Sequence, residues 1–356
     1  MTPLLEARDL GKTFGGGLLD RRHTVALRDF SLALAEGRPS VTAVVGESGS
    51  GKTTLARLLL GLLTPSGGRV GYRGQDLAAL SRGQWRAFRR EVQAIFQDPY
   101  EVYNPFYRVD HVLTTPVARF GLAASRAQGR ALIEDALRAV GLRPEETLGR
   151  FPHQLSGGQR QRVMVARALL VRPRVILADE PVSMVDASLR ATILGALARM
   201  TRERDISVIY ITHDLATAYQ ISENIVVLYR GAVVEAGDVE LVVQHPQHPY
   251  TQLLIGSIPL PRVERTWAAD GGPAPASPPP AGGPGCPFAD RCPAAMPACR
   301  RSAPPLFQTG RHRVVACFLY QEAPVLPAHQ MATAFVEPSA PSRGPGSAPP
   351  GGVSSV

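Results

Sequence analysis

Lysine and long apolar stretches are both scarce in this sequence. Lys12 and Lys52 are the only lysines among the 39 Lys and Arg residues of a 356-residue chain. The arginines are scattered rather than clustered, so the net charge of +9 reflects a general preference for arginine, and we expect no nucleic-acid partner. The longest uncharged stretches, such as 58–68 and 251–261, fall short of the roughly 18 apolar residues that span a bilayer. We therefore expect no transmembrane segment.

The sequence also shows no secretion signal and no cysteine before residue 286. The first ten residues, MTPLLEARDL, carry Glu6 and Asp9 where a signal peptide needs an apolar core. With 44% hydrophobic and 19% charged residues, the composition is that of a folded, water-soluble chain. We expect it in the cytoplasm.

Between residues 1 and 258, short apolar runs alternate with segments of helical period. The runs at 41–45, 175–178, 206–211 and 225–229 are nearly continuous, as is typical of strands buried on both faces of a parallel sheet. Strands that alternate with helices predict an α/β fold, doubly wound around that sheet.

Local patterns place further elements and the domain boundaries. Residues 131–140 have one apolar face and are followed by a glycine C-cap, and the segment from residue 228 predicts an antiparallel hairpin. A Pro/Gly-rich linker is expected over 259–285, after the domain that ends at residue 258. A Cys-containing module follows at 286–323, here called the Cys module, and a disordered tail is expected over 324–356.

Residues 46–53, here called the phosphate loop, read GESGSGKT between an apolar run and a helical run. Glycines let the backbone aim N–H groups at phosphate oxygens, and the next helix adds partial positive charge at its N-terminus. In such a loop Lys52 reaches the β- and γ-phosphates, and the Thr53 hydroxyl ligates magnesium. The residues expected to hold the nucleotide are Gly46, Glu47, Ser48, Gly49, Ser50, Gly51, Lys52, Thr53 and Thr54.

A second motif, RVILADEP at 174–181, is an apolar run that ends in two adjacent carboxylates. A strand terminus beside the phosphate loop would let Asp179 hold magnesium and Glu180 polarise an attacking water. Taken alone, such a strand end is as often only a solvated terminus. Its neighbours in the sequence favour the catalytic interpretation.

The segment LSGGQ at 155–159, here called the signature segment, indicates another anion site. A small hydroxyl and bare backbone N–H groups precede a predicted helix, whose N-terminus favours negative charge. One nucleotide does not need two γ-phosphate sites. The second site is therefore expected to serve the nucleotide of another subunit.

With these motifs in place, the sequence resembles the nucleotide-binding subunits of ATP-binding cassette (ABC) transporters, whose signature is LSGGQ. The other family motifs follow in order: Gln97 in IFQDP resembles the Q-loop, Asp186 in SMVDAS the D-loop and His213 in ITHDL the switch histidine. Phe14 in KTFGG resembles the aromatic that stacks on adenine, although a core phenylalanine is the alternative. Met184 and Val185 depart from the smaller residue and leucine that the family usually has before the D-loop aspartate.

The resemblance implies a P-loop NTPase core with an antiparallel β subdomain and a helical signature subdomain at about 98–170. It also implies a head-to-tail dimer in which ATP lies between the phosphate loop of one subunit and the signature segment of the other. Glu180 would be the general base, His213 would hold the γ-phosphate and water in line, and Gln97 would sense magnesium and the membrane domain. Magnesium would be bound by Thr53, Gln97 and Asp179. The opposite subunit would contribute Ser156, Gly157, Gly158 and Gln159. Asp186 of the D-loop is also expected among the nucleotide-binding residues.

Two further segments resemble one group within that family. QDPYEVYNP at 97–105 and HPQHPYTQLLIGSIPLP at 245–261 are similar to the ATPase subunits of oligopeptide and dipeptide importers, a group that includes nickel and glutathione systems. The resemblance implies two transmembrane permease subunits and a second, non-identical ATPase as partners, with an extracytoplasmic solute-binding protein acting indirectly. The chain would then lie on the cytoplasmic face of the membrane.

The four cysteines, Cys286, Cys292, Cys299 and Cys317, all belong to the Cys module. In a cytosolic protein, clustered cysteines favour a metal site over disulfides, but the tight pairs of most zinc sites are missing. The module resembles the C-terminal extension of the importer group, for which an iron–sulfur cluster has been indicated in some members. Four thiolates could hold a 4Fe–4S cluster, a zinc ion, or nothing.

Two other functions remain open from the sequence. One is a soluble cassette ATPase that acts on DNA or ribosomes, against which the chain has one cassette and no long heptad region. The other is a regulatory ATPase whose Cys module reads redox state.

Overall fold

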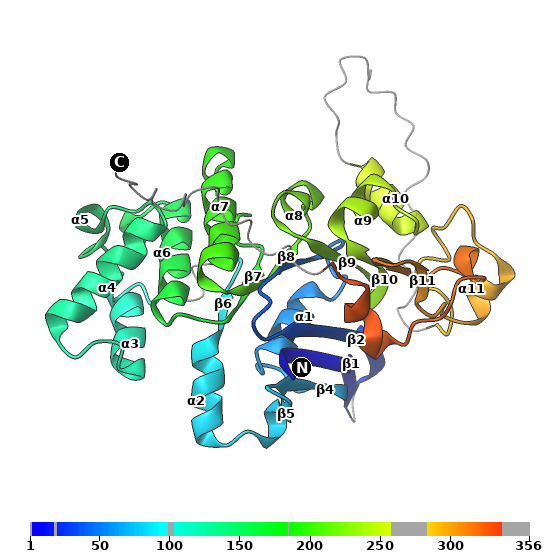
Figure 1. The fold of residues 1–356 in the computed structure, drawn as a ribbon, viewed down its shortest axis with the longest axis horizontal. Helices are drawn as coiled ribbons and strands as arrows, with labels where there is room; N and C mark the ends of the chain where they lie inside the picture. Colours follow the sequence, from blue (N-terminus) through cyan, green and yellow to red (C-terminus); the bar gives the residue numbers. More distant parts are fainter. Residues whose placement is uncertain (1, 18–19, 99–102, 184, 258–282, 337–356) are drawn as a thin grey trace, which may run out of the picture.

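The computed structural model describes residues 2–17, 20–98, 103–183, 185–257 and 283–336, and the statements below concern these residues. Two sheets form its centre (Figure 1). The larger has eight strands in the order β11-β12-β10-β9-β3-β8-β7-β6, and the smaller has four in the order β2-β1-β4-β5.

Five adjacent parallel strands of the large sheet confirm the predicted α/β core. Each of the four predicted apolar runs is a strand, shifted by no more than one residue at either end, and every residue of these strands is buried. The fifth strand, β6, has mostly buried residues and lies at the edge of the sheet. The parallel strands are β3 (Val41–Val45), β6 (Val92–Ile95), β7 (Val175–Asp179), β8 (Ser207–Thr212) and β9 (Asn224–Tyr229).

Antiparallel strands extend the large sheet past β9. The predicted hairpin is confirmed, since β10 (Ala232–Asp238) folds back on β9 with Ala232 opposite Tyr229. Next to β10 lies β12 (Arg313–Val315), and β11 (Phe307–Gly310) pairs with the other edge of β12. Both of these strands come from the Cys module, so this module continues the core sheet rather than forming a separate body.

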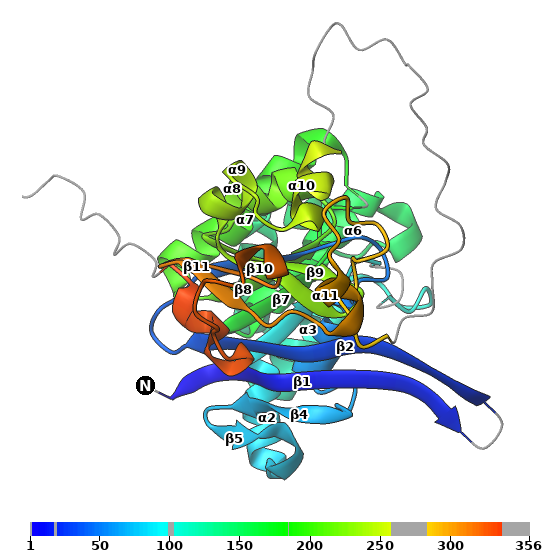
Figure 2. The same cartoon turned by 90° about the vertical axis from the view of Figure 1, so that its right-hand side faces the viewer.

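The small antiparallel sheet packs beside helix α1 and matches the β subdomain that the family resemblance implies. Its two long strands run side by side across the molecule in Figure 2. One hydrophobic cluster joins their inner residues to α1 and to one face of the large sheet. The strands are β1 (Pro3–Gly17), β2 (Asp20–Ala35), β4 (Gly67–Tyr72) and β5 (Gln75–Asp76).

Helices gather at one end of the large sheet, next to β6 and β7 (Figure 1). The predicted helix at 131–140 lies within α4, which begins earlier because Ser125 caps it through the N–H of Gln128. Gly141 follows with φ of 71°, as a C-terminal glycine requires. The helical group consists of α3 (Asp110–Phe120), α4 (Arg126–Ala139), α5 (Pro144–Thr147), η3 (Pro152–Gln154) and α6 (Gly157–Leu170).

Most of the remaining helices connect strands, whereas η4 and η5 follow the last strand, β12. The longest of the remaining helices, α7, follows β7 and packs with α8. None of the helices among the described residues is long and apolar enough to cross a membrane. They are α1 (Lys52–Leu59), η1 (Leu77–Ala79), α2 (Arg82–Glu91), α7 (Ala187–Arg204), α8 (Leu215–Ile221), α9 (Val239–Gln244), α10 (Pro249–Gly256), α11 (Pro297–Arg301), η4 (Phe318–Tyr320) and η5 (Ala328–Ala334).

Residues 324–336, expected to belong to a disordered tail, are ordered. Residues 324–336 run back across the small sheet, where η5 buries Met331 and Ala334 completely or nearly so. The amide of Asn224 exchanges two hydrogen bonds with the backbone of Val336, at 3.1 and 2.8 Å. The segment AHQMATAFV carries spaced apolar side chains that favour packing, even though the tail as a whole is rich in Pro and Ser. The rest of the tail, and most of the predicted linker, lie outside the described residues.

Candidate functional site

The phosphate loop turns from the end of β3 into α1. Gly49 and Gly51 have φ of 79° and 103°, in the region that favours glycine. A Cβ at Gly46 would lie 2.2 Å from the carbonyl oxygen of Leu228, and one at Gly51 would lie 2.3 Å from that of Ala26. The glycines are therefore required by close approach of the neighbouring backbone as well as by the turn.

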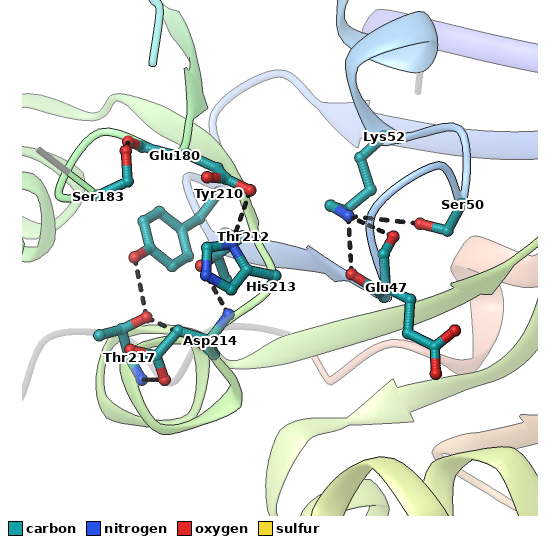
Figure 3. A network of polar contacts seen from close by, with 11 residues as sticks. Glu47, Ser50, Lys52, Glu180, Ser183, Tyr210, Thr212, His213, Asp214 and Thr217 are labelled. Carbon is teal, nitrogen blue, oxygen red and sulfur yellow. Dashed lines mark hydrogen bonds and ion pairs between the residues drawn. The ribbon is translucent and has the colours of Figure 1, made fainter. Parts of the chain in front are cut away.

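Lys52 fills the centre of this loop. Its Nζ donates to the carbonyl oxygens of Gly46 at 2.7 Å and Glu47 at 2.9 Å (Figure 3). Burial lowers the pKa of Lys52, while the carboxylates of Glu180, Asp179 and Glu47 oppose that shift. The ammonium group thus lies among backbone carbonyl acceptors of the loop and faces the acidic end of β7.

Asp179 and Glu180 end β7 next to that ammonium. Asp179 is 5% exposed, and burial raises its pKa above the usual value even though a hydrogen bond from Thr53 opposes that shift. The Thr53 hydroxyl and the Asp179 carboxylate therefore meet. Glu180 has a positive φ of 47°, unusual for a residue with a side chain, and its N–H donates to Ile211 at 2.8 Å.

His213 follows the neighbouring strand β8 and reaches Glu180. Its Nδ1 lies 2.8 Å from Glu180 Oε1 (Figure 3). The next residue, Asp214, caps α8 through the N–H groups of Ala216 and Thr217. This capping fixes the turn on which the histidine stands.

The signature segment lies at the start of α6, within the helical group. Ser156 is exposed and accepts from the N–H of Gln159, while the Gln159 side chain accepts from the N–H of Ser156. Gly157 and Gly158 form the first turn of the helix. Figure 1 places this group at the far end of the sheet from the small β sheet that flanks α1. The two anion sites predicted from the sequence thus belong to different parts of the chain.

Gln97 and Asp186 occupy exposed turns. Gln97 follows β6, and the preceding Phe96 carbonyl accepts from Gln161 of α6 at 3.2 Å, which ties this turn to the signature helix. Asp186 stands at the start of α7 without capping it through its side chain. Val185 is buried, whereas Met184 and residues 99–102 lie outside the described part of the chain.

Phe14 lies on β1 and is 41% exposed, which leaves its ring accessible for stacking rather than in the core. Lys12 Nζ lies 5.2 Å from the centroid of that ring.

Three residues that the sequence did not single out also contact the phosphate loop or support it. Tyr250 Oη accepts from the N–H of Glu47 at 2.9 Å, and Arg291 pairs with the Glu47 carboxylate at 3.0 Å. Tyr229 Oη lies 3.3 Å from Arg291 Nη1. They stand in segments noted for other reasons: Tyr250 in the HPQHPY stretch, Arg291 in the Cys module and Tyr229 at the end of an apolar run. No spacing tied them to the phosphates.

The four cysteines are free thiols, close enough to one another to affect the pKa of Cys286 and Cys317. Burial, helped by the neighbouring Cys286, Cys292 and Cys299, raises the pKa of Cys317 to about 11. The N–H of Cys286 donates to the carbonyl of Cys299 at 2.7 Å. Within the described ranges, no three His, Cys, Asp or Glu side chains come close enough to bind a single metal ion.

Comparisons with known sequences place these motifs in a family. The model of the ABC transporter family matches residues 27–183, and that of the oligopeptide/dipeptide transporter C-terminal region matches 234–299. The chain is 39% identical to the putative oligopeptide transport ATP-binding protein YkfD of Bacillus subtilis, over 90% of this chain and 97% of that protein. It is 38% identical to the oligopeptide transport ATP-binding protein OppF of Salmonella typhimurium, over 81% and 86%.

Solved structures agree with this placement. A dimeric ATP-binding cassette, MJ0796, in a post-hydrolysis state bound to ADP and Pi, matches with a TM-score of 0.59 and 28% identity, over 66% of this chain and 98% of that one. The cassette cbiO1 of Clostridium perfringens matches with a TM-score of 0.57 and 27% identity, over 69% and 92%. Together with the motifs above, these similarities show that the chain belongs to the ABC transporter ATPases, in the group of oligopeptide and dipeptide transport ATP-binding proteins.

Proposed function

We propose that this ATPase drives the import of peptides, and that it hydrolyses ATP at sites shared between two cassettes. The observation that supports a shared site is the separation of the phosphate loop from the signature segment within one chain. Each can be completed only by its counterpart on another cassette. The dimeric cassette bound to ADP and Pi supports the same arrangement.

In the proposed site, Lys52 exchanges its bonds to the Gly46 and Glu47 carbonyls for phosphate oxygens. The loop N–H groups and the N-terminus of α1 hold the same phosphates. Phe14 offers its exposed ring to the adenine. From the other cassette, Ser156, Gly157, Gly158 and Gln159 cover the γ-phosphate, with Asp186 beside them.

The residues at the end of β7 suit magnesium. Thr53 and Asp179 offer a hydroxyl and a carboxylate that already meet, and Gln97 offers an amide oxygen, all ligands of a kind that magnesium accepts. The ion would neutralise charge on the β- and γ-phosphates. Asp179 is buried and already receives the Thr53 hydrogen bond, so it is oriented before the nucleotide arrives.

Glu180 is the proposed general base. Its carboxylate is turned toward His213, which orients it and would hold the attacking water in line with the γ-phosphate. Closing the dimer on two nucleotides favours the closed state, and hydrolysis releases it. That cycle is how the chemistry would move a membrane partner.

The names of the relatives support peptides as the transported substrate, and the match over residues 234–299 supports the peptide group over cassettes that act on nucleic acid or ribosomes. The proposed partners are two permease subunits and a second, non-identical ATPase, with a solute-binding protein acting through the permeases. The chain would be peripheral on the cytoplasmic face of the membrane.

The Cys module is proposed to hold a 4Fe–4S cluster. Its thiols lie near enough to one another to raise the pKa of Cys286 and Cys317, and four thiolates are the ligand set that such a cluster needs. Cys286, Cys292, Cys299 and Cys317 would be its ligands. Anaerobic purification followed by iron and sulfide analysis tests this, and a protein free of iron would contradict it.

Affinity purification from gently solubilised host membranes tests the function itself. Recovery of two polytopic membrane proteins and a second cassette is the expected result, and their reconstitution should give ATP-dependent peptide uptake. Recovery of ribosomes or DNA-bound proteins in their place would contradict transport.

A further inference from the structure

Glu47, the second residue of the phosphate loop, is held by groups far from it in the sequence. Its carboxylate accepts both terminal nitrogens of Arg291, with Nη1–Oε2 at 3.0 Å and Nη2–Oε1 at 3.2 Å. Its N–H donates to Tyr250 Oη at 2.9 Å. Its carbonyl accepts from Lys52 Nζ, also at 2.9 Å. One residue thus links the ammonium group of the ATP site to α10 and to the Cys module.

Arg291 is oriented as well as paired. A guanidinium that meets both oxygens of a carboxylate is fixed in angle, which a single contact does not achieve. Nη1 also donates to Tyr229 Oη at 3.3 Å, and the guanidinium carbon lies 5.7 Å from the ring centroids of both Tyr229 and Phe288. With side-chain exposures of 33% for Arg291 and 41% for Glu47, the pair is partly shielded from water.

The base of Arg291 is anchored in the core. Phe288 is 1% exposed and packs on Tyr229 and Tyr250, with ring centroids 5.3 and 5.5 Å away. The N–H of Arg291 donates to the Phe288 carbonyl at 3.0 Å. Phe288 and Tyr229, the two aromatic neighbours of Arg291, are therefore fixed in position. The turn between Cys286 and Cys292 places the guanidinium against the phosphate loop.

We propose that Arg291 is a positioning residue for ATP binding: it holds the phosphate loop through Glu47 and so makes ATP affinity depend on the folded Cys module. In this role the residue acts only through the loop. The proposal rests on the phosphate loop as the ATP site.

Loss of Arg291 should weaken ATP binding for two reasons. The Glu47 carboxylate would be unpaired beside a site for an anionic ligand, and like charges repel. The loop would also lose an anchor and pay a larger ordering cost when ATP binds. Both effects act on bound ATP and on the transition state alike, so the KM for ATP should rise while kcat changes little.

The test is equilibrium ATP binding and steady-state hydrolysis by the full chain, assembled with its partners for the hydrolysis assay. Arg291→Gln should raise the Kd and KM for ATP by about 3- to 10-fold, the range for a partly shielded charged pair. Arg300→Gln is the matched control, because Arg300 belongs to the same module and pairs with Asp290 at 3.3 Å, away from the loop. It should bind ATP as the wild type does.

A double-mutant cycle separates pairing from general damage. Glu47→Gln and Arg291→Gln should each weaken binding, and the double variant should be no worse than the weaker binder of the two. If Arg291→Gln fails to fold, Arg291→Lys, which keeps the charge but loses the fork, takes its place in the cycle. Additive losses, or a Kd for Arg291→Gln equal to that of Arg300→Gln, would overturn the proposal.

Reciprocity gives an independent readout. If the module sets ATP affinity, ATP must stabilise the module to the same extent. Hydrogen exchange of the amides in 286–299 should slow when ATP binds to the wild-type chain and stay unchanged in Arg291→Gln. Equal slowing in both would contradict the coupling. A wild-type chain that binds no ATP would instead remove the proposed function, so the two failures are distinguishable.

Discussion

The Nδ1 atom of His213 lies 2.8 Å from the Oε1 atom of Glu180, and this contact joins the ends of two adjacent parallel strands. Carboxyl ends of neighbouring parallel strands meet at one edge of a sheet, which is where α/β proteins place their ligand sites. Glu180 reaches that position through a left-handed backbone conformation, held by the bond from its N–H to Ile211. The strained residue and its histidine partner are thus part of one preorganised unit.

Replacing Glu180 by Gln should abolish turnover without abolishing ATP binding. The amide keeps the size of the side chain but cannot accept a proton, so kcat should fall by about 100-fold or more. Binding by titration and hydrolysis by phosphate release measure the two effects separately. Hydrolysis near the wild-type rate would sink the assignment of the general base.

Replacing His213 by Ala tests the orienting role. The carboxylate stays in place but loses its partner, and misplacement of a catalytic group typically costs on the order of 100-fold in rate. The Kd for ATP should stay close to the wild-type value, since Lys52 and the loop are untouched. His213→Gln, which can still reach Glu180, is the control and should retain more activity than Ala. Full activity of the Ala variant would mean that the contact between His213 and Glu180 matters only in the chain without nucleotide.

The signature segment should act only in the assembled transporter. Ser156→Arg places a bulky cation at the exposed start of α6, where the nucleotide of the other cassette is expected. ATP binding by the isolated chain should be unchanged, while hydrolysis by the complete assembly should fall at least tenfold, because a donor to the γ-phosphate is blocked. Lys52→Ala is the contrasting variant and should lose binding by the isolated chain. Loss of binding in both variants would mean that the chain uses its own signature segment.

Two glycines of the phosphate loop allow the cost of a left-handed backbone to be measured apart from the cost of a steric clash. Gly49 and Gly51 both have positive φ, but a Cβ at Gly49 meets nothing within 4 Å, whereas one at Gly51 would lie 2.3 Å from the Ala26 carbonyl. Gly49→Ala should cost about 1–2 kcal/mol of unfolding free energy, the cost of a left-handed residue with a side chain. Gly51→Ala should cost more, because β2 must also move. Urea midpoints measure both, and equal midpoints would contradict the model of a close approach.

The sequence predicted the elements that have a local or repeated residue pattern. It missed the contacts between residues that lie far apart in the chain. Strands buried on both faces must be apolar throughout, so the strand at 41–45 could be predicted to the residue. Glu47 and Arg291 are 244 residues apart, and each alone resembles an ordinary exposed charge. The packing of Met331 was hidden for a related reason: its partners lie on the small sheet, while its neighbours in the chain are polar or small.

The last prediction concerns stability against pH. His248 is almost completely buried, its Nδ1 accepts from the N–H of Tyr250 at 3.0 Å, and burial lowers its pKa to about 4. Between about pH 6.5 and 4 the unfolded chain therefore binds a proton at this residue that the folded chain does not. Folding free energy is lost as the pH falls through that window, about 2 kcal/mol by pH 5, and is fully present above it.

His248→Asn is the variant that isolates this contribution. Asparagine can still cap α10 through its side-chain oxygen, but it does not titrate. The buried neighbour Glu235, which accepts from the N–H of residue 248, is common to both proteins and cancels in the comparison. The variant should be less stable than the wild type at pH 7.5, because packing against Phe288 is lost, and the gap should narrow by about 2 kcal/mol at pH 5. Urea unfolding at both pH values measures the gap. A gap that stays constant would show that His248 carries its proton in the folded chain, and that the N–H of Tyr250 has another acceptor.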